Sequence, residues 1–116
     1  IMTIEECYQA MGADYEDVSH RIPNAALVKK FALKFLEDKS MEQLTVALKD
    51  GAVEDAFRAA HTLKGLCLTL GFSALAKPSI ELTELLRGRR MDGYEPLYEQ
   101  VLAEYEKTVA ALRQVD

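Results

Sequence analysis

The chain of 116 residues is 49% hydrophobic and 28% charged, a composition typical of one soluble domain with a substantial core, so we expect a single domain over residues 1–116. Its 19 acidic and 14 basic residues give a formal net charge of −5, which argues against nucleic acid as the main partner and gives no attraction to anionic membranes. No apolar run approaches the ~18–20 residues of a membrane span and no signal-peptide pattern is present, so we expect a cytoplasmic protein without a membrane partner.

The first predicted helix covers residues 4–11. Thr3 followed three residues later by Glu6 is a capping-box pattern, and Gly12 supplies a C-terminal stop. We interpret Met2 as the natural first residue of a complete small protein. The polar segment 14–22 is predicted to form either a turn or a short helical piece.

A long helix is predicted over residues 24–50, directly after Pro23, a residue suited to a first helical turn. The alternative is a break into two helices near Asp38-Lys39-Ser40. The prediction rests on apolar residues that recur at helical spacing, namely Leu27, Val28, Phe31, Phe35, Leu36, Met41, Leu44, Ala47 and Leu48.

Three further helices are predicted over residues 52–70, 74–88 and 94–114. Gly71 ends the first of them, and Pro78 is expected to bend the second or delay its regular start, because proline removes one backbone hydrogen bond. No alternating pattern typical of strands competes anywhere in the chain. The fold class is therefore all-α, and we expect an antiparallel up-and-down four-helix bundle with a short N-terminal capping helix.

The two cysteines, Cys7 and Cys67, lie in separate helical segments without a closely spaced partner. We expect buried free thiols in a reducing cytosol, with a disulfide as the less favoured alternative.

The helix over 52–70 divides into two faces at about 100° per residue. The core face is predicted to hold Ala52, Ala56, Ala59, Leu63, Leu66 and Leu70, with Ala60 and Cys67 at its margin. The opposite face holds Glu54, Phe57, Arg58, His61, Lys64, Gly65 and Leu68. Phe57 and Leu68 are either exposed there or covered by the first helix.

Three residues of the outward face, His61, Lys64 and Gly65, form one patch because residues three and four apart share a helical face. An outward histidine or lysine is commonly just a solvated residue. Gly65 is harder to explain, because glycine in a helix interior costs roughly 1 kcal/mol relative to alanine and no helix end is near. We interpret the patch as a docking site around a nucleophile.

Phosphoryl transfer fits this patch best. An unprotonated imidazole is a nucleophile near neutral pH, and the ammonium of Lys64 can offset the charge of a phosphoimidazole. Such transfer needs mainly positioning and charge neutralisation, so a donor protein can bring the metal ion, and we expect no cofactor on this chain. A nucleotide-binding loop, a zinc helix and an outward Cys–His pair are all missing, and His20 lacks a comparable surround.

The segment Ala60-His61-Thr62-Leu63-Lys64-Gly65, with Leu70-Gly71 at the helix end, resembles the signature of histidine-containing phosphotransfer (HPt) domains. The order of helices along nearly the whole chain is similar as well. The resemblance implies that His61 is the phosphoacceptor, that Lys64 neutralises phosphate, and that Gly65 admits the active site of a receiver domain. Gly71 becomes a structural turn residue.

The chain departs from the family's pattern at Leu66, Cys67, Leu70 and Phe72, which bear on packing and partner choice. The resemblance implies a phosphocarrier without ATP-dependent kinase activity, working with response-regulator receiver domains and a hybrid sensor kinase. We expect a monomer that docks them through Phe57, Arg58 and Leu68. The alternative is a helical adaptor that binds such partners without carrying phosphate. Arg87, Arg89 and Arg90 favour a solvated end or steering of an acidic receiver over nucleic-acid binding.

Overall fold

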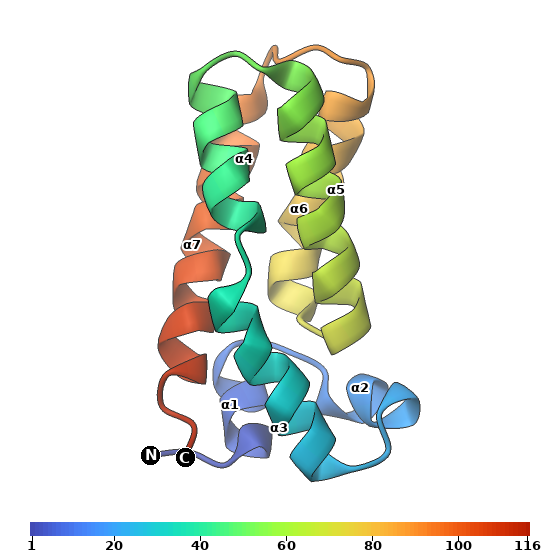
Figure 1. The fold of residues 1–116 in the computed structure, drawn as a ribbon, viewed down its shortest axis with the longest axis vertical. Helices are drawn as coiled ribbons and strands as arrows, with labels where there is room; N and C mark the ends of the chain where they lie inside the picture. The colour runs from blue at the N-terminus through green and yellow to red at the C-terminus, as the bar shows by residue number, and fades with distance from the viewer.

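The computed structural model describes residues 1–116 and is all-helical (Figure 1). None of its helices combines the length and the apolar character needed to cross a bilayer. The chain ends lie together, where Met2 forms an isolated bridge with Val115. The elements in chain order are α1 (Ile4–Ala10), α2 (Tyr15–Arg21), α3 (Ala25–Lys34), the 3₁₀ turn η1 (Phe35–Glu37), α4 (Ser40–Lys49), α5 (Val53–Leu70), α6 (Ser73–Arg87) and α7 (Tyr94–Leu112).

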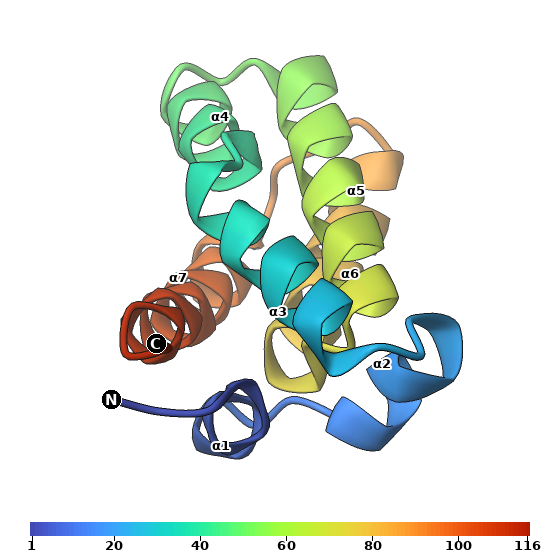
Figure 2. The same ribbon diagram turned by 60° about the horizontal axis from the view of Figure 1, so that its bottom comes forward.

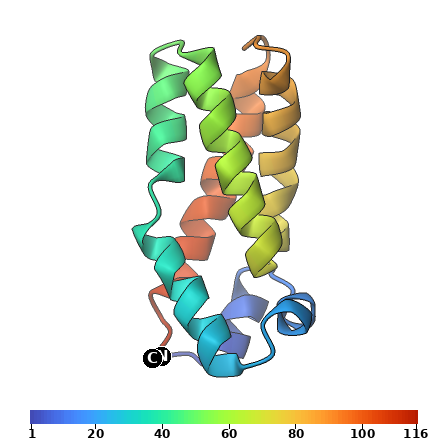
Figure 3. The same ribbon diagram turned by 45° about the vertical axis from the view of Figure 1, so that its right-hand side comes forward.

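Helices α4, α5, α6 and α7 stand side by side, and α5 packs against both α4 and α6 (Figures 1 and 3). Helices α1, α2 and α3 gather at one end of this group, near the C-terminal end of α5 (Figures 1 and 2). The core runs through both parts, and at the lower end it is aromatic. There Phe72 meets Tyr8 and Phe35 with ring centroids 5.6 and 5.2 Å apart.

The interval 24–50 is not one helix, so the prediction of a single long helix is wrong and the alternative break near Asp38 is correct. Asp38 adopts an extended backbone (φ −70°, ψ 141°), which a continuous helix does not allow. Its carboxylate accepts a hydrogen bond from the Ser40 amide at 2.9 Å. Asp38, which precedes the N-cap residue Lys39, thereby supplies an acceptor for the first free N–H of α4.

The remaining helices start and end within one or two residues of the predicted bounds. The capping box of Thr3 and Glu6 forms at α1, and segment 14–22 contains the short helix α2. Helix α6 begins at Ser73, so Pro78 lies inside it without delaying its start. Both cysteines are free and buried, and burial raises the pKa of the Cys67 thiol to about 12.

The C-terminal end of α5 is fixed by donors from the N-terminal helices. Arg21 donates to the carbonyl oxygens of Leu68 and Thr69 at 2.9 Å each, and it is held in place by Asp17 at 2.7 Å. The Tyr8 hydroxyl donates to the Leu70 carbonyl at 2.7 Å. These bonds satisfy carbonyl groups that every α-helix leaves without an internal partner at its end.

Gly71 follows directly and is required by two features. Its φ of +74° lies in the left-handed region, and a Cβ there would stand 2.7 Å from the Asp14 carbonyl oxygen. The Asp14 amide in turn donates to the Gly71 carbonyl at 2.7 Å. The turn after α5 therefore docks tightly against the start of α2.

We expect Tyr8→Phe to lower the free energy of unfolding by about 1–2 kcal/mol, because the buried Leu70 carbonyl loses its donor while the ring stays in place. Urea denaturation followed by circular dichroism measures the change. Tyr15→Phe is the matched control, because the Tyr15 ring packs on Tyr8 but its hydroxyl makes no hydrogen bond within the chain. Equal destabilisation by both substitutions would contradict the role of the Tyr8 hydrogen bond.

Candidate functional site

The outward face of α5 carries the patch that the sequence singles out. Its buried stripe, formed by Ala56, Ala59, Ala60, Leu63, Cys67 and Leu70, packs toward α4 and α6. Because this stripe fixes the rotation of the helix, His61 and Gly65 are exposed and Lys64 is half-buried. Leu66, predicted to face the core, is only partly buried, because α3 leaves a cleft beside it.

Gly65 is free of contacts within the chain. A Cβ added there would meet no heavy atom within 4 Å, in contrast to the crowded Gly71. Packing inside the protein therefore does not require a glycine at this position of a regular helix. The open space lies one turn from His61, on the same face.

The imidazole of His61 stacks on the ring of Phe57, with centroids 5.9 Å apart and planes inclined by 23°. The two residues are one turn apart on α5, so the contact follows from the helix itself. Neither ring nitrogen of His61 makes a hydrogen bond within the chain. Both nitrogens are thus available to a group that approaches from outside.

Phe57 is half-buried and is covered by Arg87, the last residue of α6, and by Arg89 from the loop that follows. The guanidinium carbons of Arg89 and Arg87 lie 4.1 and 5.2 Å from its ring centroid. Arg89 also forms an ion pair of 2.6 Å with Glu54. The alternative prediction that the first helix covers Phe57 is therefore wrong. The two arginines cover this residue instead.

Ion pairing lowers the pKa of two carboxyl groups near the site. Hydrogen bonds from Arg89 hold the pKa of Glu54 below its ordinary value. Glu84 accepts from Arg87 at 3.0 Å, and this bond, together with the nearby charges of Arg87, Lys64 and His61, lowers its pKa in the same way. Both carboxylates are therefore charged near neutral pH.

Lys64 is the cation of this face that remains unpaired. Arg87 and Arg89 are engaged with Glu84 and Glu54, and Arg58 lies 3.8 Å from Glu54. No carboxylate lies within 4.0 Å of the Lys64 ammonium. An incoming anion at His61 would therefore find one free ammonium on the next turn of the helix.

A family model of the Hpt domain matches residues 35–115. The chain belongs to the Hpt domain family. Comparison with curated proteins and with solved structures gave no match. Hpt domains take part in histidine phosphotransfer in phosphorelays, where they interact with receiver domains and kinases and act as phosphocarriers rather than as kinases.

The match begins at Phe35, the first residue of η1. Helices α1, α2 and α3 therefore precede the matched Hpt residues. Their donors Tyr8 and Arg21 nevertheless hold the end of the helix that carries His61. In this Hpt domain protein the preceding helices are thus part of the support of the site.

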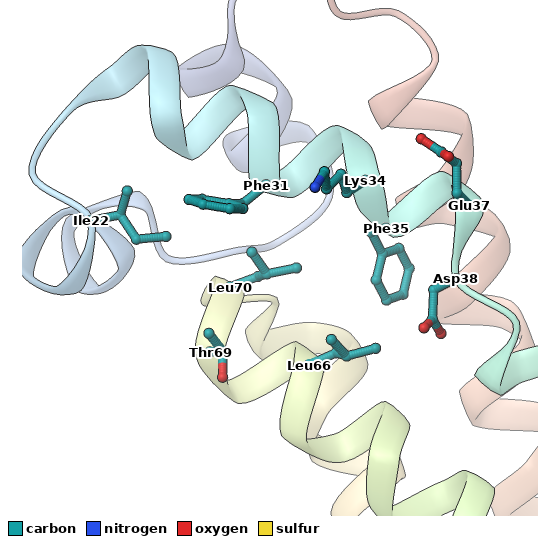
Figure 4. A pocket seen from close by; sticks show the side chains of 9 residues that line it. All are labelled: Ile22, Phe31, Lys34, Phe35, Glu37, Asp38, Leu66, Thr69 and Leu70. Carbon is teal, nitrogen blue, oxygen red and sulfur yellow. The ribbon is translucent and has the colours of Figure 1, made fainter.

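A cleft of about 590 Å³ opens between α3 with η1 and the last turns of α5 (Figure 4). Its apolar walls include Phe31 from α3 and Leu66 and Leu70 from α5, and Phe31 is 41% exposed. The sequence did not indicate this cleft, because apolar spacing on a helix does not show that its neighbour diverges. Its α5 walls lie about 8–14 Å along the helix axis from His61, at 1.5 Å per residue.

The three predicted docking residues differ in how much of their surface is exposed. Leu68 is 50% exposed and the Arg58 side chain is 69% exposed, so both are open to a partner. Phe57 offers a partner less surface because of Arg87 and Arg89. The sequence points to these arginines only as a basic loop, since their contact with Phe57 needs the packing of α6 on α5.

We expect Arg89→Gln to raise the pKa of Glu54 toward its ordinary value, because the hydrogen bonds that favour the carboxylate are lost. The measurement is an NMR titration of the Glu54 side chain in both proteins. In the wild type the depressed pKa stabilises the fold above the unfolded-state pKa, and this contribution is lost as pH falls through the folded-state pKa. Arg90→Gln is the control, and an unchanged Glu54 titration in Arg89→Gln would contradict the ion pair.

Proposed function

We propose that this chain is a histidine phosphocarrier of a multistep two-component phosphorelay. His61 accepts a phosphoryl group from receiver-domain aspartates and donates it to them, and the chain has no ATP-dependent kinase activity. One observation carries the proposal: the exposed imidazole has an unpaired ammonium, Lys64, and an uncrowded glycine, Gly65, on the next turn of the same face. The membership in the Hpt family supplies the reaction class.

In the transfer step a ring nitrogen of unprotonated His61 attacks the phosphorus of an aspartyl phosphate. A P–N bond forms as the P–O bond to the aspartate breaks, and the bonding electron pair stays on the aspartate as a carboxylate. The reverse step returns the group to an aspartate of another receiver. Lys64 offsets the negative charge of the phosphoimidazole, and the space at Gly65 lets the receiver's active site approach the helix.

The docking surface, as we propose it, extends from Arg58 and Leu68 to the cleft beside Phe31. The occupant is a receiver domain that presents apolar side chains flanked by carboxylates. Exposed Phe31 supports the apolar part, and the exposed Lys30 and Lys34 beside it form no ion pair within the chain. Charge complementarity of this kind steers association and fixes orientation.

The same proposal includes the scaffold. An antiparallel up-and-down four-helix bundle, capped by α1 and α2, holds His61 on a convex surface, and the carrier works as a cytoplasmic monomer. A hybrid sensor kinase and receiver domains are its partners, with no part for nucleic acid, a membrane or a bound cofactor. The convex site is supported by the outward position of His61, which has no cavity of its own to enclose a substrate.

We expect His61→Gln to abolish the acid-labile, alkali-stable phosphate that the wild-type chain acquires from a phosphorylated receiver. The measurement is radiolabel transfer followed by acid and alkali treatment. His20→Gln is the matched control and retains the label, because His20 lies on α2 and its ring contacts the Glu16 carbonyl of its own helix. A wild-type chain that binds receivers but never takes the label would be an adaptor, and the carrier function would be refuted.

Gly65→Ala should increase the free energy of unfolding by about 0.5–1 kcal/mol, because alanine favours the helix and its Cβ meets no other atom of the chain.

Gly65→Leu should fold equally well but take phosphate from a receiver at least about 10-fold more slowly, because its side chain fills the space that the receiver needs. Labelling by phosphoramidate, a small donor, should stay unchanged. Unaltered receiver-dependent rates in Gly65→Leu would contradict the steric role of this glycine.

A further inference from the structure

We propose that Phe57 is a positioning residue for His61. This proposal rests on the proposed function. The ring of Phe57, held under Arg89, forms a platform that sets the orientation of the imidazole. The platform acts on the rate of transfer within the complex with a receiver, and it adds little to the affinity for that receiver.

The imidazole depends on Phe57 because the chain offers it no other directional contact. His61 is exposed, and neither of its nitrogens is hydrogen-bonded within the protein. An exposed side chain on a helix ordinarily exchanges among rotamers. The stack on Phe57, at 5.9 Å and 23°, has the offset geometry that aromatic pairs favour.

Phe57 is itself held by arginines from the end of α6 and the loop that follows. The guanidinium of Arg89 lies over its ring at 4.1 Å, close enough for a cation–π interaction, and Arg87 approaches to 5.2 Å. The ring also packs partly against the hydrophobic core. Phe57 is therefore fixed on both the arginine side and the core side, and it can hold a second ring at a constant position.

Arg89 is fixed in turn by several bonds and an unusual backbone conformation. Its guanidinium donates to both Glu54 oxygens, at 2.6 and 3.1 Å, and to the Arg87 carbonyl at 2.7 Å. Its φ of +58° lies in the left-handed region, and among the non-glycine residues only Arg89 has a positive φ. Such a conformation persists only where the surroundings over-determine it, and it is often associated with functional sites.

A comparison with Leu68 shows how Phe57 differs from a docking residue. A docking residue offers free apolar surface, as Leu68 does at 50% exposure. The ring of Phe57 is instead occupied by two guanidinium groups and by the imidazole. The arrangement Glu54–Arg89–Phe57–His61 is a chain of contacts that ends on the phosphoacceptor.

The first test is structural and needs no receiver. NMR side-chain couplings and ring-proton shifts of His61 are compared in the wild type, Phe57→Leu and Phe57→Tyr, with circular dichroism as the check of folding. We expect one dominant His61 rotamer and ring-current shifts in the wild type and in Phe57→Tyr, and rotamer averaging in Phe57→Leu. Arg89→Gln keeps the Phe57 ring but removes the guanidinium that holds it, so the His61 rotamers should be partly averaged. Unchanged His61 couplings in Phe57→Leu would overturn the proposal.

The second test separates positioning from docking. A receiver that labels the wild-type chain is first phosphorylated with acetyl phosphate. Single-turnover transfer from this receiver is then measured at increasing receiver concentrations. We expect Phe57→Leu to lower the rate at saturating receiver about 10-fold, with the half-saturating concentration changed by less than about 2-fold, because misplacing a reacting group affects the bound complex. Phe57→Tyr, which keeps an aromatic ring, should retain the wild-type rate at saturating receiver.

Leu68→Ala is the matched docking control and should show the opposite pattern, a raised half-saturating concentration with little change at saturation. The same pattern in Phe57→Leu would make Phe57 a docking residue and overturn the proposal. A wild-type chain that no receiver labels would contradict the proposed function alone, because the NMR comparison decides the orientation of His61 independently.

Discussion

The rotation of α5 about its own axis is fixed by the burial of one apolar stripe against α4 and α6, and the rest of the site depends on that constraint. Small residues in the stripe, Ala56, Ala59 and Ala60, let the neighbouring helices approach closely. Once the stripe is buried, the 3.6-residue period fixes the face of α5 on which His61 lies. Hydrophobic packing on the opposite side of α5 thus places His61 on the outer surface.

The end of the same helix is held by residues that precede the matched Hpt region. Tyr8 and Arg21 satisfy the last carbonyl groups of α5, and Asp14 docks against the Gly71 turn. These contacts join α1 and α2 to the site. The bond from Tyr8 to the Leu70 carbonyl is buried and would be costly to leave unmade, whereas the bonds from Arg21 are exposed. The break at Asp38 has a related effect, because it directs α3 away from the axis of α4, and the cleft beside Phe31 opens between α3 and α5.

The charges around the site are arranged so that Lys64, one turn from His61, is left without an ion pair. Glu54 and Glu84 engage the guanidinium groups of the α6 end, and those groups cover Phe57. No carboxylate lies within 4.0 Å of the Lys64 ammonium, although its charge still acts on Glu84. Arginine suits the first task because its planar group stacks and forms bidentate pairs, while a flexible lysine suits the neutralisation of phosphate that we propose for Lys64.

The sequence by itself determined the helices outside residues 24–50, their approximate ends and the outward position of His61, Lys64 and Gly65, because caps, glycine stops and helical period are local properties of the chain. Tertiary structure decided the break at Asp38, the half-exposed Leu66, the cleft and the contact of Arg89 with Phe57 and Glu54. A broken and a continuous helix share the same apolar spacing over residues 24–50, so periodicity could not separate them. Glu54 and Arg89 are 35 residues apart, and only the packing of α6 on α5 brings them together.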